Sequence, residues 1–387
     1  MTLVGPPRRR GAEASSTLAG VAVLVMSVAT SGGLGLAPRI LLPPAGQLYH
    51  GVYPGGVTGE EDDLTPADVA SYEEAVGKQV AWVYFSHNWY HSRAFPLATA
   101  EWIRAGGSVP FVRLMLRSDP EQDHAEPTFT LARIIAGDFD SDLRAWADAA
   151  RDFGSPLLVE YGTEVNGEWF PWNGKWNGGG RPDLYGDPTV SDGPERFRDA
   201  YRRIVDTCRG EGASNITWVY HVNAESWPQQ SWNTPAAYYP GAAWVDWIAV
   251  SAYGAQTPLD DDWPVFRTLI DGAYPALTAL DADKPIIVAE FGVTSGNRRG
   301  EPGPWADAAL LDLIEGRWPR VMGFSWWNER WQNDGIASHD TDMRVQDNAA
   351  LAAVFRAHVG GSASVLGRPS QSLPSRRPFR LLLRAAR

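Results

Sequence analysis

Two carboxylates are prominent in this sequence because each one follows an apolar run. The segment Val159–Gly174 (VEYGTEVNGEWFPWNG) begins as a strand and then places Glu164 among amide and aromatic residues. The segment Lys284–Gly292 (KPIIVAEFG) ends its apolar run with Glu290. A carboxylate at the end of a buried strand is costly unless something pairs with it. A salt bridge would explain one such residue, whereas two of them favour catalysis by a pair of carboxylates.

Two carboxyl groups that face a sugar suffice for glycoside hydrolysis. One must be protonated to help the leaving oxygen depart, while the other attacks the sugar or activates water. The chain has 46 acidic and 34 basic residues, a net charge of −12, which argues against a nucleic-acid partner. Its 18 Trp and 13 Tyr residues are unusually numerous and indicate glycan binding or a bulky aromatic core.

Other kinds of chemistry lack a motif. The single cysteine, Cys208, excludes an internal disulfide and is expected to be a packing residue in a helix. The sequence has no CxxC or HExxH pattern, so no metal site is predicted. It also has no GxxxxGK[ST] motif and no GxGxxG after a strand, so no cofactor is expected.

The N-terminal segment has the features of an export signal. Arg8, Arg9 and Arg10 precede an apolar run over Leu18–Thr30 that ends near the small-residue triplet Ser27–Ala29. We therefore expect a secreted or extracytoplasmic protein, with residues 1–45 as signal peptide and linker. The alternative is an uncleaved anchor that associates with the membrane or cell envelope.

From Gln47 onward, short apolar runs alternate with helix-like stretches eight times. This alternation predicts a (β/α)8 TIM barrel over residues 46–358, with a doubly wound sheet as the alternative. Residues 359–387 are rich in Ser, Pro and Arg and are interpreted as a basic tail. The expected strands are Gln47–Tyr53, Gln79–Phe85, Ser108–Leu116, Pro156–Gly162, Ile216–His221, Val245–Ala252, Pro285–Phe291 and Val321–Trp327.

A series of blocks resembles one known family. In order along the chain, they read IIAGDFDSDLRAWADAARDFGSPLLVEY, TEVNGEWFPW, YYPGAAWVDWIAVSAYG, KPIIVAEFG and FSWWNE. The series is similar to glycoside hydrolase family 26, retaining (β/α)8 enzymes that include β-mannanases, β-1,3-xylanases and lichenase-type glucanases. The resemblance implies double displacement on a β-linked polysaccharide such as mannan, xylan or glucan.

The resemblance also implies roles for residues. Glu164 matches the general acid/base, Glu290 the nucleophile, and Tyr253 the tyrosine that hydrogen-bonds the nucleophile. Trp326 is expected to form the floor of the cleavage subsite, while its neighbour Trp327 packs outward. Three further substrate contacts are expected near Glu164, namely Trp169, Trp172 and Asn166.

The chain departs from the family pattern beside the acid/base. Thr163 stands where a histidine is common, and Glu160 where an arginine is common. Strand alternation points Glu160 into the barrel, where an unpaired charge is costly, and Arg113 on the third strand is its candidate partner. The altered surroundings of Glu164 keep one alternative open, a glycan-binding barrel that has lost catalysis.

Histidines near the active face are the last candidates. His87 follows the second strand and His221 ends the fifth, so both could contact substrate. The segment Lys175–Gly193, rich in Gly, Asp and Pro, is a candidate to close one end of the cleft. Together these patterns predict an exported, endo-acting, retaining β-glycosidase that binds a polysaccharide or oligosaccharide.

Overall fold

The computed structural model describes residues 39–56, 59, 61 and 63–370. The expected signal segment and most of the expected tail lie outside these residues. Among the described residues, no helix combines the length and the apolar character that crossing a membrane requires.

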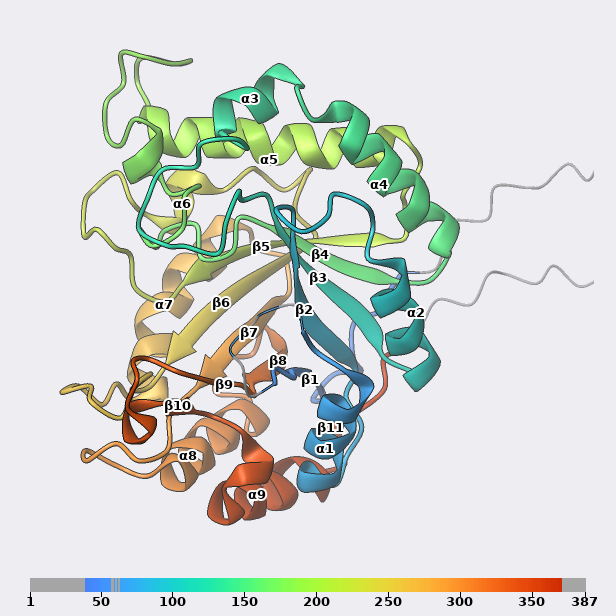
Figure 1. Cartoon of the computed structure of the whole chain (residues 1–387), viewed down its shortest axis with the longest axis vertical. Helices are drawn as coiled ribbons and strands as arrows, with labels where there is room; N and C mark the ends of the chain where they lie inside the picture. Colours follow the sequence, from blue (N-terminus) through green and yellow to red (C-terminus); the bar gives the residue numbers. More distant parts are fainter. Residues whose placement is uncertain (1–38, 57–58, 60, 62, 371–387) are drawn as a thin grey trace, which may run out of the picture. The chain divides into compact units, whose positions relative to one another are not determined.

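Eight parallel strands close into a barrel, so the predicted (β/α)8 fold is confirmed. Each strand pairs with the next along the chain, and β1 pairs with β8 to complete the ring (Figure 1). The strands are β1 (Leu48–Tyr53), β2 (Trp82–Asn88), β3 (Val109–Met115), β4 (Leu157–Tyr161), β5 (Ile216–Asn223), β6 (Trp247–Tyr253), β7 (Ile286–Gly292) and β8 (Val321–Trp327).

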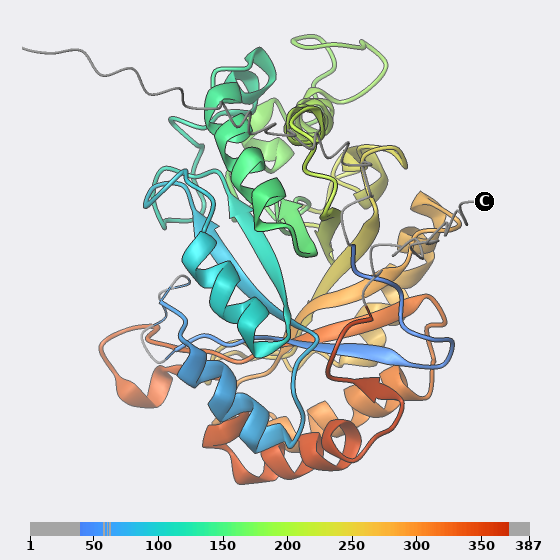
Figure 2. The ribbon, with the colours of Figure 1, turned by 90° about the vertical axis from the view of Figure 1, so that its right-hand side faces the viewer.

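Helices cover the outside of the barrel in both views (Figures 1 and 2). Local capping signals set several of their ends. Thr65 and Asp68 form a capping box at the start of α1, and Pro66 occupies its first turn. The helices are α1 (Pro66–Val76), α2 (Leu97–Gly106), α3 (Leu131–Ala136), α4 (Asp140–Phe153), α5 (Asp192–Gly210), α6 (Pro235–Tyr238), α7 (Phe266–Leu280), α8 (Pro302–Ile314) and α9 (Ala349–Phe355).

Strand alternation divides the core in two. Alternate residues such as Tyr49, Trp82 and Phe111 fill the inside of the barrel, while their neighbours pack against the helices. Cys208 is buried on α5, as expected for a packing residue.

Two boundaries differ from those expected. Strand β2 begins at Trp82 rather than Gln79 and continues to Asn88, which carries His87 within the strand. The chain after α9 also stays on the barrel, because β11 (Val365–Leu366) pairs in parallel with Leu48 and Tyr49 of β1. Residues 361–370 therefore pack with the barrel rather than beginning a tail at 359.

Candidate active site

A cavity of about 470 Å³ opens at the carboxyl ends of the strands, the end at which barrel enzymes place their catalytic groups. It is lined by Gly59, Glu61, Arg113, Gln122, Glu164, Trp169, Phe170, Asn223, Tyr253, Gln256, Glu290, Trp327, Glu329 and Trp331. The structure thus brings Glu164, Glu290, Tyr253 and Trp169 to one cavity.

An irregularity in β7 turns Glu290 toward this cavity. The pairing with β6 matches Val250 to Val288 but Ser251 to Glu290, so Ala289 is an extra residue. Such bulges re-aim side chains next to active sites. Because Ile287 and Ala289 already belong to the inner core, strict alternation would have turned Glu290 outward.

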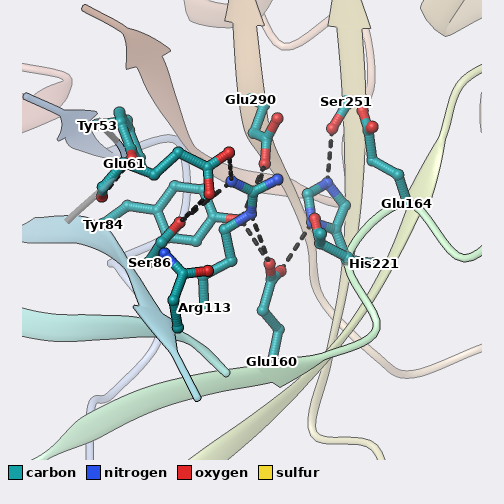
Figure 3. Close-up of polar contacts among 12 residues, drawn as sticks. Tyr53, Glu61, Tyr84, Ser86, Arg113, Glu160, Glu164, His221, Ser251 and Glu290 are labelled. Atoms are coloured by element: carbon teal, nitrogen blue, oxygen red, sulfur yellow. Dashed lines mark hydrogen bonds and ion pairs between the residues drawn. The ribbon is translucent and has the colours of Figure 1, made fainter. Parts of the chain in front are cut away.

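Both oxygens of Glu290 accept a phenol hydrogen bond. Tyr253 donates to Oε2 at 2.8 Å, and Tyr84 of β2 donates to Oε1 at 2.9 Å. Arg113 Nε lies 3.6 Å from Oε1 (Figure 3). Burial raises the pKa of Glu290, and Arg113 opposes this rise by favouring the ionised form. The carboxylate is fixed in position by two phenol donors and one guanidinium, which come from three strands.

Glu164 lies beyond the end of β4 on an unusual backbone. Its φ of 47° is in the left-handed region, which a non-glycine residue rarely adopts, and such conformations cluster at functional sites. Trp169 Nε1 donates to its Oε2 at 2.7 Å, and Asn223 Nδ2 donates to its Oε1 at 3.0 Å. These two contacts hold the carboxyl group at the cavity wall.

Asn166 was expected to contact substrate, but it supports Asn223 instead. Its side chain is fully buried, and its Oδ1 accepts a hydrogen bond from Asn223 N at 2.7 Å. Its Nδ2 donates to Asn223 O at 2.9 Å. Asn166 therefore fixes the strand end that carries one of the two donors to Glu164.

The predicted pairing of Glu160 with Arg113 is confirmed, with Arg113 Nε 3.8 Å from Oε1. The Tyr84 hydroxyl also lies 2.5 Å from Glu160 Oε1, so its single hydrogen is shared between Glu160 and Glu290. His221 donates to Glu160 Oε2 at 2.7 Å. Burial acts to raise the pKa of Glu160, but the charges and hydrogen bonds of His221, Arg113 and Tyr84 outweigh it and lower the pKa. Burial acts to lower the pKa of His221, but the charge and hydrogen bond of Glu160 outweigh it and raise the pKa. Glu160 and His221 therefore form an ion pair.

His221 is consequently a structural partner rather than a substrate contact. It is fully buried, and its second ring nitrogen bonds Ser251 Oγ at 2.8 Å. Glu160, His221 and Glu290 offer atoms within 4.8 Å of one another, the spacing of a metal site. Hydrogen bonds and the Arg113 guanidinium already occupy this cluster, so the donor set fits internal charge balance better than a cation.

Three other expected contacts also lie away from the cavity. Trp326 is fully buried on the outer side of β8, where its indole donates to Met343 O, and Trp327 lines the cavity in its place. Trp172 is buried and donates to Thr163 O. His87 is buried, which lowers its pKa to about 4, and does not line the cavity.

Loops contribute residues that the sequence pattern did not single out. Glu61 follows β1 and pairs with Arg113 and Arg117 at 3.2 and 2.7 Å. Glu329 and Trp331 follow β8, and Trp331 belongs to the short strand β9 (Arg330–Trp331), which pairs with β10 (Thr341–Asp342). Proximity to the end of a strand was the available signal for Glu329.

A second cavity of about 490 Å³ adjoins the first and shares Trp169, Asn223, Tyr253 and Gln256 with it. Trp227, 45% exposed, lines the second cavity but not the first. The residues 175–193 line neither cavity, so the expectation that this segment closes the cleft is wrong for the described structure. The two cavities thus meet at Trp169 and Asn223, the residues that hold Glu164.

Comparison with known proteins gives relatives that are named as an endoglucanase and as mannosidases. Endoglucanase H of Acetivibrio thermocellus is 24% identical over 298 residues, which are 76% of this chain and 29% of that protein. A mannan endo-1,4-beta-mannosidase of Bacillus subtilis is 27% identical over 198 residues, 49% of this chain and 44% of that protein. The matched parts thus span less than half of these relatives.

Solved structures share the fold. A β-mannanase from Bacteroides ovatus superposes with a TM-score of 0.56 at 16% identity, covering 83% of this chain and 90% of that one. An endo-beta-1,4-mannanase double mutant from Cellulomonas fimi gives 0.58 at 17% identity, covering 83% and 72%. The family model described as glycosyl hydrolase family 26 matches residues 126–343, more than half of the chain. This chain therefore belongs to glycosyl hydrolase family 26.

Proposed function

We propose that this protein is a retaining endo-β-glycosidase that cuts a β-linked polysaccharide by double displacement. The observation that carries the proposal is the pair Glu164 and Glu290 on one cavity, each held by its own set of donors. Glu290 attacks the anomeric carbon while Glu164 gives its proton to the leaving oxygen. Glu164 then takes a proton from the water that releases the sugar from Glu290.

The surroundings of the two acids support different roles. Tyr84, Tyr253 and Arg113 all favour an ionised Glu290 in a fixed orientation, which a nucleophile requires. Glu164 lines the first cavity where it adjoins the second, because its partners Trp169 and Asn223 line both of them. A proton donor at that position meets a glycosidic oxygen whose chain continues in both directions, as endo action requires.

The substrate we propose first is β-1,4-mannan, since mannosidases are among the similar proteins. A β-glucan is the second candidate, because the relative matched over 76% of this chain is named an endoglucanase. We also propose export, which rests on the pattern of basic and apolar residues before Thr30.

The test is hydrolysis of β-mannan, β-1,3-xylan and mixed-linkage β-glucan, measured as the release of new reducing ends. NMR then identifies the anomer of the first product. We expect initial formation of the β-anomer on one of these polymers. Glu290→Ala should lose activity by at least about 10⁴-fold while remaining folded. Glu168→Ala is the matched control, because Glu168 pairs with Lys175 and does not line the cavity. Binding without hydrolysis would identify a non-catalytic glycan-binding barrel instead.

A further inference from the structure

Glu329 is one of four acids on the wall of the first cavity, and the proposed mechanism does not use it. It follows Trp327 by two residues and lines the cavity, yet its side chain is 2% exposed. Its Oε1 is buried and has no hydrogen-bond partner among the described residues. A buried carboxyl oxygen without a partner is costly, so this atom requires either a proton or a ligand.

The groups around Glu329 disfavour its charge. Glu61 and Asp63, from the loop after β1, both repel a carboxylate at this position. Arg113 of β3 opposes them, but its guanidinium is already shared with Glu61, Glu160 and Glu290.

Burial raises the pKa of Glu329 to about 8, Glu61 adds to the rise, and a hydrogen bond from Trp327 and the charge of Arg113 reduce it. The Tyr53 phenol of β1 also faces Glu329, and burial raises its pKa well above the ordinary value, so it adds no second charge. The acid is therefore neutral near pH 7.

The side chain of Glu329 cannot withdraw from the wall. A Cβ built on Gly55 would lie 2.5 Å from its Cγ and 2.7 Å from its Cδ, so the backbone of the loop after β1 packs directly against it. Its own carbonyl accepts a hydrogen bond from Met343 N at 3.0 Å. The carboxyl group is held in place before any ligand enters.

Its position also indicates which part of a substrate it meets. Trp169 and Asn223, the two partners of Glu164, line both cavities, whereas Glu329 lines only the first. Glu290 lines the first cavity alone as well. The sugar transferred to Glu290 thus occupies the first cavity, on the side of Glu329, while the departing chain extends past Asn223 toward Trp227.

We propose that Glu329 is a specificity-determining residue whose unpartnered carboxyl donates a hydrogen bond to an acceptor oxygen of the transferred sugars, so that the site selects uncharged sugars over sugars carrying a carboxylate. This inference rests on the proposed function. A sugar carboxylate would add a further negative charge beside the carboxylates of Glu61 and Glu290 on the cavity wall.

The experiment compares wild type, Glu329→Gln and Glu329→Ala on the fastest polymer of the panel above, at pH 6 and pH 9. Glutamine keeps the shape of the side chain and supplies an N–H donor, so we expect kcat/KM of Glu329→Gln within about 5-fold of wild type at pH 6. Because the amide does not titrate, residue 329 should cause no further loss in this variant at pH 9. Alanine should lose about 10- to 100-fold at pH 6. Wild type should decline at pH 9 relative to Glu329→Gln. Glu168→Gln, which removes a carboxylate outside the cavity, should follow wild type.

A second arm uses the same polymer oxidised at C6 to carry carboxylates, which wild type should cut at least about 10-fold more slowly than the neutral polymer. Equal kcat/KM for wild type, Glu329→Gln and Glu329→Ala at both pH values would overturn the inference while leaving the proposed function intact. Faster cleavage of the oxidised polymer would overturn it as well.

If wild type hydrolyses none of the polymers, the proposed function fails, and binding of mannopentaose by calorimetry judges Glu329 separately. Weaker binding by Glu329→Ala then supports the inference, whereas an unchanged Kd, or no binding by any variant, overturns it.

Discussion

The charged groups of Arg113 and Glu160 lie 3.8 Å apart inside the barrel, on neighbouring strands that pair these two residues in register. Neither side chain is more than 3% exposed. Removing one partner of a buried ion pair leaves an uncompensated charge, at a cost of about 3–5 kcal/mol. We therefore expect Arg113→Met to lose stability by this amount in urea unfolding and to lose most activity.

The control is Arg133→Met, which removes an exposed arginine paired with Asp138. Its cost should stay below about 1 kcal/mol. Unchanged stability and hydrolysis in Arg113→Met would show that Glu160 and Glu290 do not depend on this guanidinium.

Tyr253 and Tyr84 donate to different oxygens of Glu290, so their phenylalanine variants form a matched pair. Losing either donor destabilises the ionised form of Glu290, the proposed nucleophile, and raises its pKa. Because the nucleophile must be ionised, the acid limb of the kcat/KM profile should move to higher pH in both variants. We expect kcat to fall about 10²-fold in each.

Tyr84→Phe should also lose stability, since Tyr84 donates to the buried Glu160 as well. Tyr201→Phe is the control, because that hydroxyl donates to Val219 O inside the structure. An acid limb that stays in place in both active-site variants would refute the assignment of these donors.

Asn166→Ala tests a residue that acts through another. Without Asn166, Asn223 loses its backbone anchor, and Glu164 loses the orientation that Asn223 provides. The loss of kcat should therefore depend on how strongly the leaving group needs protonation. We expect kcat to fall about 10-fold or more on an aryl glycoside with a poor leaving group and much less on a nitrophenyl glycoside. Equal losses on both substrates would indicate general damage to the fold.

Glu329 predicts a pH dependence of stability. Its pKa is about 8 in the folded protein, against about 4.3 for a free glutamate. Between these values the folded state binds a proton that the unfolded state does not, so stability falls as pH rises, by up to about 1.4 kcal/mol per pH unit, and levels off above pH 8.

Thermal unfolding between pH 5 and pH 9 measures this effect. The Tm difference between wild type and Glu329→Gln should decline with rising pH, because glutamine does not titrate. Glu168→Gln should keep a constant difference from wild type. A constant difference for Glu329→Gln as well would mean that Glu329 is already ionised at low pH.

The strand pattern predicted more of this molecule than the side chains beyond the strands. Apolar runs located the eight strands, and the rule that barrel catalysis sits at their carboxyl ends selected Glu164 and Glu290. Alternation along β3 and β4 also predicted the contact of Arg113 with Glu160, because both residues occupy inward positions of straight strands.

The same alternation did not predict correctly which of the two adjacent tryptophans on β8 faces the inside of the barrel. Trp326 and Trp327 are both aromatic, so hydrophobicity could not tell which one faces inward. Their neighbours could have done so, because the small residues Gly323 and Ser325 lie against Trp82 inside the barrel and share the parity of Trp327. The extra residue Ala289 in β7 depends on pairing between strands and leaves no mark in the sequence.

The sequence also did not predict which polar residues are buried and hydrogen-bonded inside the protein. Asn166 and His221 were expected to contact sugar because of their type, yet each is fully buried and bonded to neighbouring strands. Glu61 and Glu329 reach the cavity from loops whose path the sequence does not define.

The left-handed backbone of Glu164 has a consequence for efforts to make this protein more heat-resistant. Glycine adopts that conformation without steric penalty, so Glu164→Gly would relieve strain of the order of 1 kcal/mol. A library of variants selected only for remaining folded after heating would therefore enrich glycine at residue 164 and lose the proposed proton donor. Any such selection also has to require hydrolytic activity, because thermal stability favours glycine at residue 164 and activity favours glutamate.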